Sequence, residues 1–135
     1  MSFDGVVSKE GAGASVWIIS PKMGSKLHFF KLAFRCTNSE AEYEALLSGL
    51  NILKDLKVKM IVVQGYSKLV IKQVQGTYQA KHPRMRAYRN VVLDLLDYFL
   101  ERVFSVIPRE QNSIVDVLSS AASSFKIPIH PNRRY

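Results

Sequence analysis

Three acidic side chains stand where they could act together on a metal ion. Asp4 lies on a short strand candidate, Glu42 in the first turn of a long helix candidate, and Asp116 in the first turns of the last helix candidate. Carboxylates that converge from separate elements bind hard divalent ions such as Mg²⁺, which need oxygen ligands. Each acid also has a structural explanation of its own: a turn residue beside Gly5, an acid favoured by the helix dipole, and a solvated helix residue. The surroundings of each acid therefore decide between these interpretations.

The elements that must position these acids follow from the apolar pattern. Runs rich in β-branched and aromatic residues, bounded by turn residues at 8–13 and 22–25, predict strands. Periodic apolar stripes behind Thr37 and Pro83 predict helices. The predicted strands cover residues 3–7, 14–20, 26–34, 60–63 and 103–107, and the predicted helices cover 37–57, 67–74, 85–101 and 111–124. This order predicts an α/β fold with a five-stranded mixed sheet, in which three antiparallel strands precede two parallel additions, flanked by helices.

Length and charge bound the function. The chain has 135 residues, of which 19 are Lys or Arg and 11 are Asp or Glu, for a formal net charge of +8. We expect one domain over residues 1–124, followed by a loose tail over 125–135. A surplus of this size favours a polyanionic partner, either nucleic acid or an anionic membrane, although a basic protein with neither partner has the same composition.

The compartment is predicted from cysteine usage and from the lack of long apolar runs. Cys36 is the one cysteine in the chain, which excludes an internal disulfide and fits a reducing, intracellular location in the nucleus or cytoplasm. As a side chain it is best interpreted as a small, buried or half-buried hydrophobe and not as a nucleophile. We expect no secretory signal, no membrane span and no membrane partner.

Four blocks of sequence occur in a specific order. They read DG at residues 4–5 with GAGA at 11–14, TNSEAEYEALLSGL at 37–50, VQGYSKLV at 63–70, and IPREQNSIVDVL at 107–118. Together they closely resemble the type I ribonuclease H domain, in the form carried by plant long-terminal-repeat retrotransposons and related plant proteins. The resemblance covers about residues 3–124 and agrees with the predicted order of strands and helices, with one extra helix.

This resemblance implies a hydrolase for the RNA strand of an RNA–DNA hybrid. Family members use four carboxylates to hold two divalent ions, Mg²⁺ or Mn²⁺. One ion activates the attacking water and the other stabilises the leaving oxygen. Asp4, Glu42 and Asp116 match the first, second and fourth metal ligands, whereas Tyr66 stands at the position of the third, an aspartate.

Tyr66 makes loss or strong impairment of hydrolysis the expected outcome. A neutral phenol, with a pKa near 10, is a poor replacement for a carboxylate on Mg²⁺. The ring either turns outward and leaves a half-built site, or it fills the ion cavity with its hydroxyl bonded to Asp4 or Glu42. Rescue by a nearby acid or water is the less drastic alternative, but residues 64–72 contain no acid.

The residues that contact nucleic acid in the family are better preserved. Thr37 and Asn38 match contacts to the DNA phosphate and the minor groove, and Ser67 and Asn112 match positions near the hybrid. Cations around the second long helix form a candidate phosphate-facing set, or else a merely solvated face. These cations are Lys81, Arg84, Arg86, Arg89, Arg102 and Arg109, of which Arg84 and Arg86 are the strongest candidates.

Three functions are therefore compatible with the sequence. The first is a ribonuclease H-like domain that binds RNA–DNA hybrid or a related duplex with a disabled metal centre. The second is an active or weakly active two-metal endonuclease on such hybrids. The third is a retained fold that serves as a protein-interaction module. The first is the favoured interpretation because it accounts for both Tyr66 and the preserved binding residues.

Overall fold

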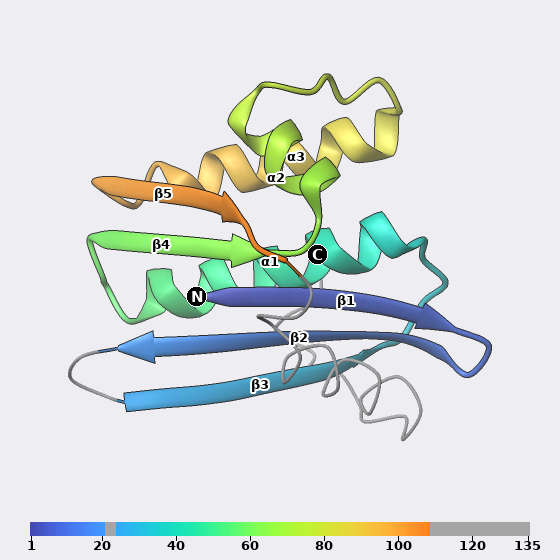
Figure 1. Ribbon diagram of the computed structural model, residues 1–135, viewed down its shortest axis with the longest axis horizontal. Helices are drawn as coiled ribbons and strands as arrows, with labels where there is room; N and C mark the ends of the chain where they lie inside the picture. Colours follow the sequence, from blue (N-terminus) through green and yellow to red (C-terminus); the bar gives the residue numbers. More distant parts are fainter. Residues whose placement is uncertain (21–23, 109–135) are drawn as a thin grey trace.

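The computed structural model describes residues 1–20 and 24–108. Its strands form one five-stranded sheet in the order β3-β2-β1-β4-β5, with helices lying along one face (Figure 1). The elements are β1 (Ser2–Ser8), β2 (Gly11–Ser20), β3 (Gly24–Leu32), α1 (Asn38–Asp55), β4 (Met60–Gly65), α2 (Lys68–Gln75), α3 (Pro83–Leu96) and β5 (Glu101–Val106). The α/β class is confirmed. The predicted last helix at 111–124 and the tail at 125–135 lie outside the described residues.

Strand pairing confirms the predicted mixed sheet. β1 pairs antiparallel with β2, and β2 pairs antiparallel with β3, while β4 runs parallel to both β1 and β5. The expected turn over residues 8–13 was too long, since Ser8 already pairs with Gly11 and only two residues lie between them. Gly11 adopts a φ of 133°, which residues with a side chain rarely adopt. A glycine at this position therefore lets the chain turn into β2 without backbone strain.

The second long helix ends earlier than expected. Its apolar stripe continues to Phe99, which is buried, but α3 ends at Leu96. The reason is competition from the sheet: the N–H groups of Leu100 and Glu101 donate to the carbonyl oxygen of Lys59, just before β4. The chain therefore enters β5 at Glu101, two residues before the expected start, and Phe99 reaches the core from a turn.

One apolar core joins the sheet to the three helices. α1 packs on β1 and β2, and α3 packs on α1. Leu46, Leu47 and Leu50 of α1 are completely buried, as are Val70 and Ile71 of α2. Within residues 1–20 and 24–108, no helix combines the length and the apolarity needed to cross a membrane. The core fixes α1 against β1, which sets the geometry of the candidate site.

Candidate functional site

A glycine contact brings Asp4 and Glu42 to the same place. A Cβ atom on Gly5 would lie 2.4 Å from the backbone carbon of Ala41 and 2.5 Å from the backbone nitrogen of Glu42. Only glycine allows β1 and the first turns of α1 to approach this closely. Asp4 precedes Gly5 and is buried, while Glu42 is half-buried. The two acids predicted as the first and second metal ligands are thus held at one strand–helix contact.

Strand register places Tyr66 beside the same contact. In the parallel pair of β1 and β4, Phe3 is level with Gly65, the last residue of β4. A Cβ on Gly65 would lie 2.7 Å from the Phe3 ring, so this approach also depends on glycine. Tyr66 follows Gly65 as Asp4 follows Phe3, and Tyr66 is half-buried. The position predicted to have lost a carboxylate is therefore adjacent to Asp4.

The described residues do not fit a two-ion centre by themselves. The residues that the backbone brings to this contact carry two carboxylates, Asp4 and Glu42, and one phenol, Tyr66. No group of three His, Cys, Asp or Glu side chains is arranged to hold a metal ion within residues 1–20 and 24–108. Asp116, the predicted fourth ligand, lies outside the part of the chain that the structure describes. Two carboxylates supply fewer anionic oxygens than a pair of Mg²⁺ ions needs.

The start of α1 is fixed by a reciprocal cap. Thr37 is the N-cap, and its side-chain oxygen accepts a hydrogen bond of 3.2 Å from the N–H of Glu40. The N–H of Thr37 in turn donates to Glu40 Oε1 at 2.8 Å. This capping box satisfies two N–H groups that the helix itself leaves unpaired. It holds Thr37 and Asn38, both exposed, at the surface beside the strand–helix contact.

An ion pair ties α3 to this cap. Arg84 Nη1 donates to Glu40 Oε2 at 2.9 Å, from a side chain that is 65% exposed to one that is 6% exposed. Burial alone would raise the pKa of Glu40. The hydrogen bonds from Thr37 and Arg84 outweigh burial and hold that pKa below its ordinary value of 4.5. Arg84, predicted as a phosphate ligand, is therefore already engaged with an acid.

Replacing Glu40 should change how stability depends on pH. Because its folded-state pKa is lowered, ionised Glu40 stabilises the fold fully above pH 4.5, and this stabilisation is lost as the pH falls through the lowered value. We expect Glu40→Gln to lower the free energy of unfolding by about 1 kcal/mol at neutral pH, with a smaller difference in acid. Urea unfolding followed by circular dichroism across this range measures it. A difference that stays constant from neutral pH into acid would contradict this explanation.

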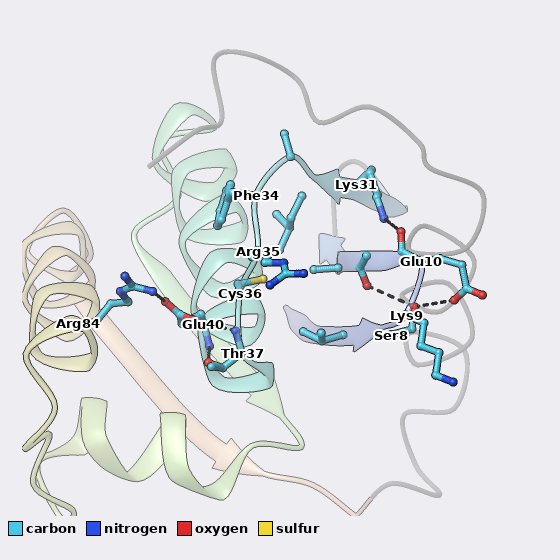
Figure 2. A pocket seen from close by; sticks show the side chains of 15 residues that line it. Ser8, Lys9, Glu10, Lys31, Phe34, Arg35, Cys36, Thr37, Glu40 and Arg84 are labelled. Carbon is cyan, nitrogen blue, oxygen red and sulfur yellow. Dashed lines mark hydrogen bonds and ion pairs between the residues drawn. The ribbon is translucent and has the colours of Figure 1, made fainter.

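A cationic groove begins at the same helix end. This groove, of about 780 Å³, is lined by residues 7–12, residues 31–37, Glu40 and Arg84. Figure 2 shows the Lys31–Glu10 contact at one end and the Arg84–Glu40 pair at the other. The groove carries four cations against two acids. The cations are Lys9, Lys31, Arg35 and Arg84, and the acids are Glu10 and Glu40.

Sequence reasoning missed three of these four cations. Lys9, Lys31 and Arg35 come from a turn, the end of β3 and the loop before α1, and they meet only because β1, β2 and β3 pair in register. The one available signal was the position of Arg35, two residues before the N-cap Thr37. A cation there lies close to any anion that binds at the start of α1.

The cations predicted around α3 do not form one face. Arg102 donates through Nη1 to the carbonyl of Leu96 at 2.6 Å, at the opposite end of α3 from Arg84. Arg86 remains exposed near Arg84, and its Nη1 donates to the carbonyl of Lys81 at 3.2 Å. The candidate set is therefore reduced to the N-terminal end of α3. Arg109 and Asn112 lie outside the described residues.

Two further residues have structural roles. Ser67 is the N-cap of α2, and its hydroxyl oxygen accepts from the N–H of Val70 at 3.1 Å.

Cys36 lines the cationic groove and is half-buried, as expected. Burial and the charges of Glu40 and Glu44 raise the pKa of its thiol to about 11. Cys36 is consequently protonated at neutral pH and is a weak nucleophile.

Comparison with known proteins gives the same assignment. The family model described as "Reverse transcriptase-like" matches residues 2–122. Ribonuclease HI of Halobacterium salinarum is 34% identical over 88 residues, which are 65% of this chain and 44% of that protein. The bifunctional protein Rv2228c of Mycobacterium tuberculosis is 32% identical over 113 residues, which are 83% of this chain and 30% of that protein. The chain thus spans less than half the length of these two relatives.

The fold is also that of solved ribonucleases H. The crystal structure of LC11-RNase H1 in complex with RNA/DNA hybrid superposes with a TM-score of 0.82 at 28% identity, covering 93% of this chain and 96% of that chain. On the evidence of sequence, fold and site, the chain belongs to the reverse-transcriptase-like family of ribonuclease H-like domains.

Proposed function

We propose that this domain binds RNA–DNA hybrid or a related duplex nucleic acid, and that its hydrolytic activity is lost or strongly impaired because Tyr66 stands where the family has a metal-ligand aspartate. The observation that carries the proposal is the placement of Tyr66 next to Asp4 by the register of β1 and β4. The cationic groove that starts at the same end of α1 supports the binding part.

The groove offers the contacts that a phosphate backbone needs. Lys9, Lys31 and Arg35 supply positive charge, and the formal charge of the chain is +8. The Thr37 oxygen accepts from Glu40 within the cap, but its own hydroxyl hydrogen can be donated to a phosphate oxygen. Contacts to the phosphate backbone of the nucleic acid depend on the shape of the duplex and not on its base sequence.

The metal site lacks what hydrolysis needs. Asp4 and Glu42 could hold one divalent ion, Mg²⁺ or Mn²⁺, and Asp116 would be the third acid of the set. Tyr66 adds a neutral hydroxyl, which binds such ions far more weakly than a carboxylate does. When fully ligated, the metal pair supplies the activated water and stabilises the leaving oxygen. We infer that this domain retains binding and has lost an efficient second ion site.

Removing one groove cation should weaken hybrid binding and its dependence on salt. Because each phosphate contact releases a bound counterion, we expect Arg35→Ala to lower affinity several-fold and to reduce the slope of log K against log salt by about one unit. Fluorescence anisotropy of a labelled RNA–DNA hybrid over a salt series measures both.

Lys59→Ala is the matched control, because Lys59 is an exposed cation beyond the opposite end of α1. It should leave both quantities nearly unchanged. Equal effects of the two substitutions would mean that the groove is not the binding surface. Lack of hybrid binding by the wild-type domain even at low salt would overturn the proposed function and favour a protein-interaction module.

The proposal also includes an origin and a location. The TNSEAEYEALLSGL block supports descent from a plant retrotransposon-type ribonuclease H. The presence of a single cysteine supports an intracellular, reducing location in the nucleus or cytoplasm.

A further inference from the structure

A second hollow adjoins the cationic groove and differs from it in chemistry. This aromatic groove, of about 530 Å³, lies between α1 and α3, and its apolar walls are Phe34, Leu47, Ala87, Tyr88 and Val91. The two grooves share four residues, which are Phe34, Arg35, Glu40 and Arg84. A chain that leaves the cationic groove past the Arg84–Glu40 pair would therefore enter the aromatic groove directly.

Tyr88 is a rigid wall of this groove. Its ring stacks on the buried ring of Tyr43, with centroids 5.4 Å apart and planes at 13°. The Tyr43 hydroxyl donates to Gln73 Oε1 at 2.7 Å, so the supporting ring is itself fixed. Burial and a hydrogen bond with Glu44 raise the pKa of Tyr88, which keeps its hydroxyl neutral. Tyr88 lines the aromatic groove, and the stack on Tyr43 fixes the position of its ring there.

We infer that the aromatic groove receives one unpaired nucleobase from the DNA strand whose phosphates occupy the cationic groove. Its walls offer aromatic and aliphatic surface, and two cations, Arg35 and the Glu40-paired Arg84, line it together with the cationic groove. This combination of a stacking surface with a cation for the attached phosphate is how proteins hold single-stranded nucleic acid. The volume lies within the range of ordinary small-ligand pockets.

The chemistry favours an unpaired base over a paired one. In a duplex both faces of each base are covered by its neighbours, so a paired base has no open face for Tyr88. A base beyond the end of the duplex has such a face, and the apolar groove removes it from water. The inference rests on the proposed function, since the phosphates in the cationic groove bring the strand to the opening.

The test compares hybrids that differ only in whether the extension carries bases. Labelled RNA–DNA hybrids are prepared with blunt ends, with a short adenine extension of the DNA strand at its 5′ or 3′ end, or with an abasic extension of the same length. We expect the adenine extension of one polarity to bind about tenfold more tightly than its abasic counterpart, as stacking of one base provides. Fluorescence anisotropy measures each affinity.

Two pairs of variants assign this gain to the groove. Tyr88→Leu removes the stacking ring and should abolish the gain, whereas Tyr88→Phe keeps the ring and should retain it. Ala87→Leu fills the groove from an exposed position of α3 and should abolish the gain, whereas Asn90→Leu adds the same bulk to α3 at an exposed residue that does not line the groove and should retain it. None of the four substitutions should alter the affinity for blunt hybrid by more than about twofold.

The possible failures are distinguishable. If the blunt hybrid binds and the adenine and abasic extensions bind equally at both ends, the inference about the aromatic groove is wrong while the proposed function stands. A gain that survives both Tyr88→Leu and Ala87→Leu also overturns it, because the base would then sit elsewhere. If the blunt hybrid does not bind at all, the proposed function itself fails.

Discussion

Tyr66→Asp should raise the rate of RNA–DNA hybrid cleavage in Mg²⁺ by about 100-fold or more. The substitution restores a carboxylate at the end of β4, next to Asp4 across the β1–β4 pair and near the contact of Gly5 with the backbone of Glu42. Stabilisation of the phosphoryl transition state by a bound metal ion is worth several kcal/mol, and each 1.36 kcal/mol is a factor of ten in rate. Single-turnover cleavage of an end-labelled hybrid measures the gain.

Tyr66→Asn is the matched control for this gain. It removes the ring as Tyr66→Asp does but adds no negative charge, so it should recover far less activity. If both variants cleave equally, the ring obstructs the site and the missing charge is not the cause. If neither variant exceeds the wild type, the damage to the metal site extends beyond residue 66, and Tyr66 is not the reason for impaired hydrolysis.

Gly5→Ala should destabilise the domain by about 3 kcal/mol. The new Cβ would lie 2.4 Å from the backbone of α1, which cannot move aside as the end of a flexible side chain can. Overpacking of this kind forces backbone shifts that cost up to a few kcal/mol. Any shift of β1 away from α1 also separates Asp4 from Glu42. Urea unfolding monitored by circular dichroism gives the free energy difference.

Gly49→Ala provides the matched control within the same core. There the nearest atom to a new Cβ is the sulfur of Met1, at the free end of a flexible side chain, and alanine favours the α1 helix by about 1 kcal/mol over glycine. It should cost clearly less than Gly5→Ala. If Gly5→Ala is as stable as the wild type, the close strand–helix approach does not constrain the site.

The sequence predicted the parts of the fold that are set locally. The β1 strand, the Thr37 cap and the α1 helix were expected from short runs of residues, because capping and apolar periodicity act within a few positions. The end of α3 was not predicted. There the apolar spacing continues to Phe99, but pairing with Lys59, far away in sequence, draws the chain into β5. The apolar spacing around α3 gives no sign of this pairing, so it cannot predict where the helix gives way to the strand.

The candidate site divides in the same way. Asp4, Glu42 and Tyr66 were identified from their motifs, and the structure brings them to one place. Lys9 was not linked to Lys31 and Arg35, because only the pairing of β1, β2 and β3 brings the turn after β1 beside the end of β3. Arg84 was predicted to face phosphate, but no local signal indicated that it pairs with Glu40 across two helices. The contacts that could not be predicted are those between residues far apart in the sequence, whereas the residue types of the site could be identified from their motifs.

The most direct test of retained binding with lost hydrolysis is to measure cleavage of hybrid that is already bound. A labelled RNA–DNA hybrid is saturated with the wild-type domain, as verified by anisotropy, then given Mg²⁺ or Mn²⁺, and the RNA strand is resolved on a denaturing gel. We predict that the hybrid stays bound while its RNA strand remains intact over times in which the Tyr66→Asp variant cuts it. Rapid cutting by the wild type that Asp4→Asn abolishes would contradict the account, because it would mean that the metal centre works without the third aspartate.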